Sequence, residues 1–266
     1  MAILNVTPDS FADGGLYFDT AKAVAQGVAL FAQGALVVDV GGESTRPGAT
    51  VVVVEEELRR VIPVITALKK AVPKGLISID SSKPEVMRQA VAAGAGMIND
   101  VNALRAPGAV AAAAKLNVPI CLMHSQGTPS TMQNAPTYTD VVIEVKEFLQ
   151  QRVDACVAGG IPRSQLWIDP GFGFGKSLAH NLQLLAQLTT LRSLGLPLLV
   201  GISRKSMLGT LLNARVEQRV IASVAAAILA VQRGANMVRV HDVEETVQAL
   251  KRFSAVTKYS EVKSGE

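Results

Sequence analysis

The chain has 266 residues, and 49% of them are hydrophobic, which is enough to fill the core of one large α/β domain. Its formal net charge of +4 favours an anionic small molecule as ligand. Lys and Arg form no long block interleaved with aromatic residues, which argues against a nucleic-acid partner, and the longest apolar stretch, residues 220–231, is too short to cross a bilayer.

Short apolar runs that end in, or carry, a polar residue recur along the chain. Such runs, bounded by Gly, Pro or polar residues, are typical of strands that are buried on both faces. The predicted strands are residues 2–4, 36–38, 76–79, 97–98, 120–123, 166–168, 198–202 and 237–240. The stretches between and after them have helical patterns: 20–33, 55–70, 84–93, 107–115, 139–158, 178–194, 216–232 and 243–256. This alternation predicts a single (β/α)8 TIM barrel.

No linker or change of composition divides the chain, so residues 1–256 are predicted to be one domain, and 257–266 a frayed tail. The predicted helix around 220–231 has few polar residues on any face, which indicates burial on two sides. We expect one side to cover the barrel and the other to pack on a second copy in a homodimer. Cys121 and Cys156 lack metal-ligand spacing and fit free thiols in a reducing cytoplasm.

Polar residues at the ends of the predicted strands are expected to meet at one rim of the barrel, where such enzymes have their active sites. Carboxylates are rarely buried without a partner. Asp80 and Asp169 therefore either pair with Arg or Lys or accept hydrogen bonds from a ligand, such as the N–H and amino groups of a purine- or pterin-like ring. Asn99 adds a donor and an acceptor. Asp39 is equally open to a purely structural role that braces the loops.

Two glycine-rich loops follow the second and sixth predicted strands. Residues 41–48 present Thr45 and Arg46 to an anion, or else form a simple Gly/Pro turn with a solvated Arg. Residues 169–176 end in Lys-Ser like a phosphate-binding loop, but their glycines have the wrong spacing. We expect these glycines to let the backbone approach a planar ligand, with Phe174 against one face of it.

The predicted seventh and eighth strands supply Ser203, Lys205, Arg239 and His241. Loops in these positions bind phosphate in many barrels, and Arg and Lys are the side chains suited to it, so we predict a diphosphate site. His241 alone would be interpreted as a structural histidine. No Ser-His-Asp or Cys-His arrangement is evident, which indicates that catalysis depends on positioning and electrostatics.

Taken together, these segments closely resemble the bacterial dihydropteroate synthases, a family of pterin-binding barrels. The segments that carry the resemblance are 5–11 (NVTPDSF), 41–48 (GGESTRPG), 80–84 (DSSKP), 99–100 (ND), 169–176 (DPGFGFGK), 203–206 (SRKS) and 239–242 (RVHD). The resemblance implies a transferase of folate biosynthesis. It would join (7,8-dihydropterin-6-yl)methyl diphosphate to 4-aminobenzoate, release diphosphate, and be a target of sulfonamides.

The resemblance also implies roles for individual residues. Asn5 would bind Mg²⁺ beside the diphosphate. The other implied groups are the pterin pocket (Asp80, Asn99, Asp169 and Lys205, with Asp39 near them), the diphosphate region (Thr45, Arg46, Arg239 and His241) and the aminobenzoate region (Phe11, Pro47 and Ser203). Within these groups, Asp80, Lys205, Arg239 and His241 are the predicted catalytic residues.

The sequence departs from the family pattern at its start, because the usual N-terminal segment is missing and residue 1 is expected to lie within the first strand. Two other functions stay open. A pterin-dependent methyltransferase shares the barrel, but it has no diphosphate to bind, so the residues around Ser203 and Arg239 argue against it. The other alternative is a pterin-binding protein without catalytic activity.

Overall fold

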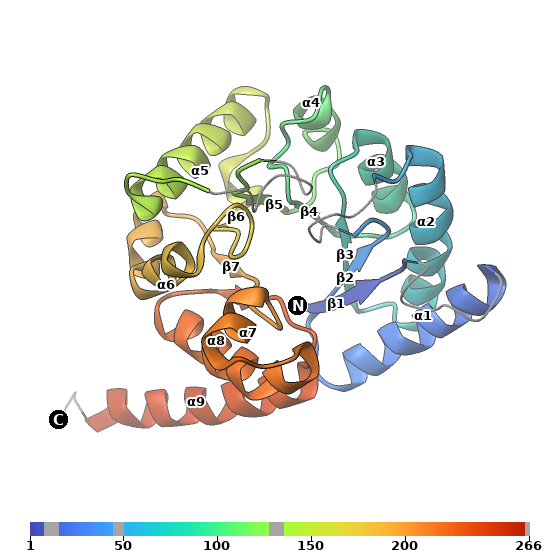
Figure 1. Ribbon diagram of the computed structural model, residues 1–266. Coiled ribbons are helices and arrows are strands. Elements are labelled where there is room, and N and C mark those ends of the chain that lie inside the picture. Colours follow the sequence, from blue (N-terminus) through green and yellow to red (C-terminus); the bar gives the residue numbers. More distant parts are fainter. Residues whose placement is uncertain (8–15, 45–50, 128–135, 264–266) are drawn as a thin grey trace.

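The computed structural model describes residues 1–7, 16–44, 51–127 and 136–263, without the side chains of 16–19 and 258–263. Within these ranges, eight parallel strands form a ring that is surrounded by helices (Figure 1). The strands are β1 (Ala2–Asn5), β2 (Val37–Gly41), β3 (Leu76–Asp80), β4 (Met97–Asp100), β5 (Ile120–Met123), β6 (Leu166–Asp169), β7 (Leu199–Val200) and β8 (Met237–Val238).

Two groups of strands close into the barrel. Strands β1 to β6 form one parallel sheet, and β7 pairs with β8. Isolated bridges join Ile168 to Leu198 on one side and Ala2 to Val240 on the other. The prediction of a TIM barrel is confirmed.

Helices follow the strands and cover the outside of the barrel. They are α1 (Leu16–Ala32), α2 (Val54–Ala71), α3 (Pro84–Ala92), α4 (Ala109–Ala113), α5 (Val141–Ala158), α6 (Leu178–Ala186), α7 (Ser206–Leu212), α8 (Val220–Gln232) and α9 (Val243–Lys263). Short 3-10 helices occur at η2 (Arg163–Gln165), η3 (Leu188–Leu194) and η4 (Val216–Arg219). The outer faces of the strands and the inner faces of the helices form the main apolar core, which includes Val38, Ile79 and Leu122.

Helix α7 was not expected from the sequence. It has only seven residues, too few to show a helical period, and it contains Gly209. A Cβ atom at this glycine would lie 2.1 Å from Nη2 of Arg219, so any larger residue would displace the end of that side chain. Helix α9 also differs from the prediction. It continues to Lys263, through most of the expected frayed tail, because no Gly or Pro interrupts residues 243–263.

The inside of the barrel has an apolar layer below a polar one. The lower layer contains Met1, Val37, Met97, Cys121 and Leu199, with Trp167 and Met237 packed against them. Because side chains alternate along a strand, the residue two positions further on also points inward, one layer higher. That step leads from Val37 to Asp39, from Met97 to Asn99, from Trp167 to Asp169 and from Met237 to Arg239. Four of the predicted site residues therefore lie in the upper layer.

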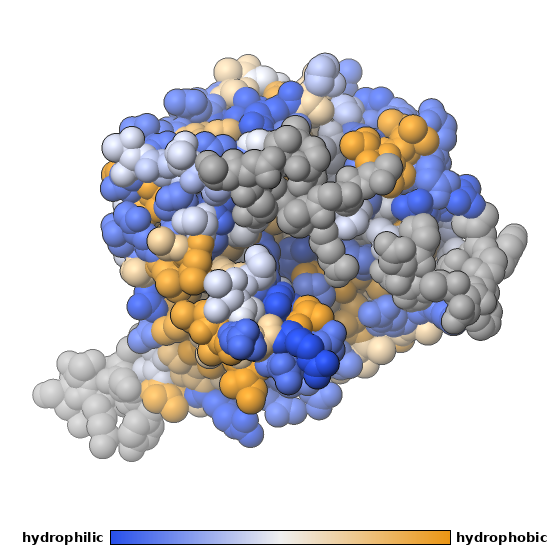
Figure 2. All heavy atoms as spheres, viewed as in Figure 1, coloured by the Kyte–Doolittle hydropathy of each residue, from blue (hydrophilic) through white to orange (hydrophobic). Residues whose placement is uncertain are grey.

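Hydrophobic side chains are exposed on and near α7 and α8. Ile221 is 84% exposed, and Leu211 and Leu212 are 55% and 53% exposed. Figure 2 shows hydrophobic residues gathered on the side of the molecule where these two helices lie in Figure 1. None of the helices in the described ranges is long and apolar enough to cross a membrane.

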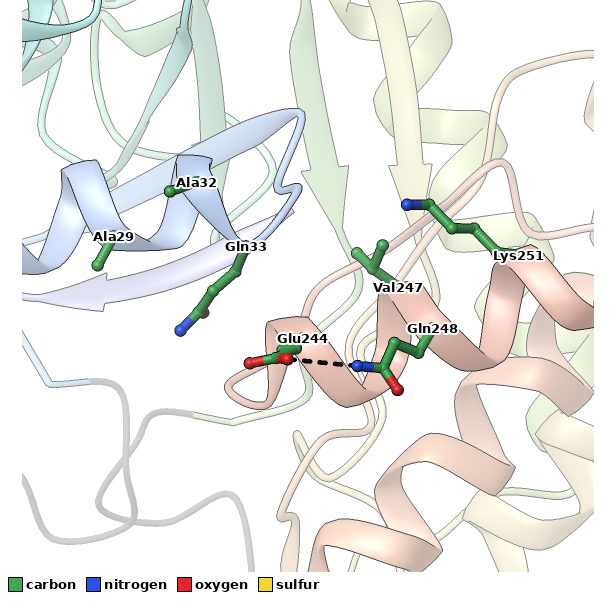
Figure 3. A pocket seen from close by; sticks show the side chains of 7 residues that line it. All are labelled: Ala29, Ala32, Gln33, Glu244, Val247, Gln248 and Lys251. Carbon is green, nitrogen blue, oxygen red and sulfur yellow. Dashed lines mark hydrogen bonds between the residues drawn. The ribbon is translucent and has the colours of Figure 1, made fainter.

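A surface groove of about 500 Å³ lies between α1 and α9 (Figure 3). Gln33 directly follows α1, and Glu244, Gln248 and Lys251 come from α9. Gln248 Nε2 donates a hydrogen bond to Glu244 Oε1 at 3.3 Å (Figure 3). The groove is lined by none of the predicted site residues, so it is separate from the polar layer of the barrel.

Candidate active site at the mouth of the barrel

Four neighbouring strands place polar residues side by side. The parallel register pairs Asn5 with Gly41, Gly41 with Asp80, and Asp80 with Asn99. Gly41 has no side chain, which leaves open the space between Asn5 and Asp80. The sequence prediction that the strand ends converge is confirmed for these residues.

Arg239 joins the polar layer into one network. Its Nε donates to Oδ2 of Asp39 at 2.7 Å, and its Nη2 donates to Oδ2 of Asp80 at 2.7 Å. Asn99 Nδ2 also donates to Oδ2 of Asp39, at 3.0 Å. Asp39 is fully buried, and its Oδ2 orients the side chains of Arg239 and Asn99. A guanidinium has five N–H groups, so these contacts leave donors of Arg239 for a bound anion.

Two buried oxygen atoms of this network accept no hydrogen bond in the described part of the chain. They are Oδ1 of Asp39 and Oδ1 of Asn99. Buried acceptors are normally satisfied, because leaving one without a donor costs about 1–3 kcal/mol. They are well suited to a ligand that brings N–H groups into the barrel mouth.

The loop after β6 is held in one shape by contacts with its own backbone. Asp169 Oδ1 accepts from the backbone N–H of Gly171 at 2.7 Å. Gly171 has φ +67°, and a Cβ atom there would lie 1.8 Å from the carbonyl oxygen of His124, so only glycine fits. Lys176 Nζ is buried beneath the loop, 2.9 Å from both the Gly171 carbonyl oxygen and Nδ1 of His124.

Lys205 reaches this loop from the neighbouring loop, which follows β7. Its Nζ donates to the carbonyl oxygen of Phe172 and lies 4.5 Å from the ring centroid of Phe174. The Phe174 ring thus has a cation over one face. Lys205 therefore lies close to both Phe174 and Asp169, which belong to β6 and the loop after it.

Ser203 and His241 connect the loops after β7 and β8. The Ser203 hydroxyl oxygen accepts from the backbone N–H of His241 at 3.1 Å and lies 3.1 Å from its Nδ1. Arg204, between Ser203 and Lys205, uses its guanidinium differently. Its Nε and Nη2 both donate to the carboxylate of Asp242, so its fork is occupied by another side chain.

Burial and neighbouring charges shift the pKa values of the site. Burial raises the pKa of Asp80, and the guanidinium of Arg239 limits the increase. Burial likewise raises the pKa of Asp169, with Lys205 as the main opposing charge. It lowers the pKa of Lys205 to about 8, although Asp169 favours the protonated form. Burial alone would lower the pKa of Arg239, but Asp39 and Asp80 outweigh it, so Arg239 stays protonated.

Two side-chain oxygen atoms flank the space beside Gly41. Oδ1 of Asn5 and Oδ2 of Asp80 lie 3.6 and 3.8 Å from the position that a Cβ atom would take there. Within the described ranges, no cluster of three His, Cys, Asp or Glu residues could hold a metal alone. Mg²⁺ commonly takes one or two protein oxygens and completes its shell with phosphate oxygens and water. An amide oxygen next to a carboxylate, at the predicted diphosphate position, is such a set.

Four predicted site residues, Phe11, Thr45, Arg46 and Pro47, lie outside the described residues. Conversely, the sequence reasoning gave no role to Lys83, whose Nζ contacts both Glu43 and the buried Glu57. Glu43 and Lys83 lie in the segments 41–48 and 80–84, but their pairing depends on the packing of α2. The sequence likewise did not predict the buried contacts of Lys176, which was noted only as the end of a segment with a superficial similarity to a phosphate-binding loop.

Comparison with known proteins agrees with this geometry. The family described as pterin binding enzyme matches residues 1–241. The dihydropteroate synthase of Escherichia coli strain K12 is 50% identical over 266 residues, which cover 100% of this chain and 94% of the relative.

Two solved structures share the fold. The Yersinia pestis dihydropteroate synthase with a sulfonamide drug complex has a TM-score of 0.92 and 50% identity, covering 97% of this chain and 94% of that one. The Xanthomonas albilineans enzyme in complex with 7,8-dihydropteroate has a TM-score of 0.88 and 54% identity, covering 97% and 92%.

The barrel and its polar mouth are those of a pterin-binding enzyme, and the chain belongs to that family. The relatives compared above are all dihydropteroate synthases, so the resemblance noted in the sequence is confirmed.

Proposed function

We propose that this transferase joins (7,8-dihydropterin-6-yl)methyl diphosphate to 4-aminobenzoate and releases 7,8-dihydropteroate and diphosphate. The observation that carries the proposal is the pair of buried acceptors, Asp39 Oδ1 and Asn99 Oδ1, in the same inner layer as Asp169. A pterin ring offers N–H and amino donors to such oxygens. The relatives at about 50% identity over the whole chain support the same activity.

The residues of the barrel mouth would have different roles in the reaction. Asp169 and Asn99 would bind the polar edge of the pterin ring, while Phe174 and Lys205 would lie against its face. As diphosphate leaves, positive charge develops on the pterin methylene, and the carboxylate of Asp80 stabilises it. Arg239 and His241 would bind the departing diphosphate. The arylamine attacks as a neutral nucleophile near pH 7, so no strong general base is needed.

Magnesium is part of the proposal, with Asn5 as its protein ligand. When bound, the ion would offset negative charge on the leaving diphosphate. An Asn5→Ala variant should need a higher Mg²⁺ concentration for half-maximal activity. Calorimetric titration of Mg²⁺ in the presence of inorganic diphosphate measures the same loss without turnover.

We also propose that the enzyme is a cytoplasmic homodimer. The support is the exposed apolar surface on and near α7 and α8, in particular Ile221. Large exposed apolar patches are common at protein interfaces. Light scattering at micromolar concentration should give twice the chain mass, and Ile221→Glu should reduce it to a monomer. An unchanged mass for the variant would place the interface elsewhere.

Incorporation of labelled 4-aminobenzoate into a pterin product tests the reaction itself. The synthase would form labelled product only with the pterin diphosphate present. A pterin-binding protein without catalytic activity would bind the pterin, more tightly with Mg²⁺ and diphosphate, yet form no product. In a pterin-dependent methyltransferase, added diphosphate would not make pterin binding tighter. Sulfonamides should compete with 4-aminobenzoate, and an inhibition constant far above the aminobenzoate KM would contradict this.

A further inference from the structure

Arg204 has a backbone conformation that is unusual for a residue with a side chain. Its φ is +56°, in the left-handed region where a Cβ atom crowds the backbone. Such residues persist only where the surroundings hold them, and they cluster at functional sites. Arg204 lies directly between Ser203 and Lys205, which both belong to the barrel mouth.

Three different segments hold Arg204 in this conformation. Asp242 accepts from its Nε at 3.1 Å and also from its Nη2. Ser223 of α8 accepts from its backbone N–H at 2.9 Å. Arg219 Nη1 donates to its carbonyl oxygen at 3.1 Å. Both the backbone groups and the side chain of this one residue are therefore bound.

The braces are themselves well anchored. Ser223 and Asp242 are 3% and 8% exposed. The Ser223 hydroxyl donates to the Arg219 carbonyl oxygen at 2.6 Å, and Thr246 Oγ1 donates to the Asp242 carbonyl oxygen at 2.6 Å. The ion pair thus connects the turn after β7 to Asp242, a buried residue directly before α9.

The consequence of the turn is the placement of its two neighbours. Ser203 reaches His241, while Lys205 reaches the Phe172 carbonyl oxygen and the Phe174 ring. An extended or helical backbone at Arg204 would move one of these side chains away from the mouth. We propose that Arg204 is a positioning residue, whose ion pair with Asp242 holds the left-handed turn that places Ser203 and Lys205 for the reaction. The inference rests on the proposed function.

The test compares Arg204→Met, Asp242→Asn and Arg204→Gly with the wild type. The first two break the ion pair and keep the Cβ crowding, so kcat should fall by about 10- to 100-fold. Glycine adopts the left-handed conformation freely, so Arg204→Gly should retain more activity than Arg204→Met. The double variant of Arg204→Met with Asp242→Asn should be no worse than either single one. Arg88→Met, which breaks the exposed pair with Glu85, is the matched control and should leave kcat unchanged.

The pH profile separates positioning from a general loss of stability. Lys205 is faced by Asp169 and Asp80, which favour its protonated form, and by Arg239, which opposes it. When the turn relaxes, Lys205 becomes more solvated, so the alkaline limb of kcat/KM should move to higher pH in Arg204→Met. A merely structural role would lower the melting temperature without moving this limb.

Binding of inorganic diphosphate, measured by calorimetry, gives a second readout that does not depend on turnover. Arg204→Met and Asp242→Asn should weaken it several-fold, since Ser203 and Lys205 line the same mouth. If both variants are folded and keep the wild-type kcat, pH profile and diphosphate affinity, the inference is wrong. If Arg204→Met does not fold, Asp242→Asn decides alone. A wild type that binds diphosphate without turnover would refute the proposed function but leave the binding comparison to judge Arg204.

Discussion

Nη2 of Arg239 and Oδ2 of Asp80 lie 2.7 Å apart, so the cation that follows β8 is bound to the carboxylate at the end of β3, although β1 and β2 lie between these two strands. The same guanidinium donates to Asp39, which is fully buried and has no direct access to solvent. Asp39 thus orients the guanidinium of Arg239. This guanidinium in turn places a positive charge beside the carboxylate of Asp80.

Asp39→Asn tests this arrangement. The amide keeps the shape of the side chain but removes the charge that holds Arg239, so we expect kcat/KM for the pterin diphosphate to fall by about 100-fold. The free energy of unfolding should fall by about 1–3 kcal/mol, because a buried hydrogen bond to a charged group is weakened. Steady-state kinetics and urea titration measure the two effects. A variant with wild-type kinetics would show that Arg239 needs no support from Asp39.

Lys205→Ala should lower kcat/KM by about 100- to 1,000-fold while the protein remains folded. The substitution removes the cation over the Phe174 ring and the contact with the Phe172 carbonyl oxygen. Circular dichroism would verify the fold. Lys251→Ala, at an exposed position of α9 outside the barrel mouth, is the control and should behave as the wild type. Near-normal turnover by Lys205→Ala would exclude its assigned role.

The dependence of kcat/KM on pH should be bell-shaped. The reaction needs protonated Lys205, whose pKa burial lowers to about 8, so activity should fall as the pH rises through about 8. It also needs ionised Asp80. Burial raises the pKa of this carboxyl group, so activity should fall as the pH drops through the raised pKa and Asp80 becomes protonated. Lys205→Arg should lose the alkaline limb, because an arginine stays protonated throughout the pH range of the measurement. An unchanged limb in that variant would assign it to another group.

A stability prediction concerns the start of α2. Val53 is its N-cap, with φ −69° and ψ 156°, and it provides no side-chain hydrogen bond to the first turn. Val53→Ser should stabilise the protein by about 0.5–1 kcal/mol, since a serine oxygen can accept from a free backbone N–H. Val51→Ser, at a position that is 77% exposed but not a cap, is the control and should change little. Equal denaturation midpoints for the two variants would speak against this explanation.

The fold could be predicted from the sequence because each of the eight buried strands is a short apolar run. The predicted 97–98 and 237–240 differ from β4 and β8 by only two residues each. Helix α7 was not predicted because seven residues are too few to show a helical hydrophobic period. The close packing of Arg219 on its Gly209 is visible only in the structure. The end of α9 was missed because charged residues at a surface do not stop a helix.

The site was predictable where one strand end or loop identifies the chemistry. Asp80, Asn99, Asp169, Lys205, Arg239 and His241 all lie at the mouth that the strand pattern indicated. Pairings between distant loops were not predictable, because they depend on barrel closure. Asp39 with Arg239 spans 200 residues, and Arg204 with Asp242 spans 38. Sequence spacing alone does not reveal that the fork of Arg204 is bound to Asp242.

The most direct test of the proposed reaction is diphosphate release by the purified enzyme, supplied with the pterin diphosphate and Mg²⁺, with and without 4-aminobenzoate. We expect release that depends on 4-aminobenzoate and is strongly reduced in Lys205→Ala. A folded wild-type protein that releases no diphosphate under either condition would contradict it.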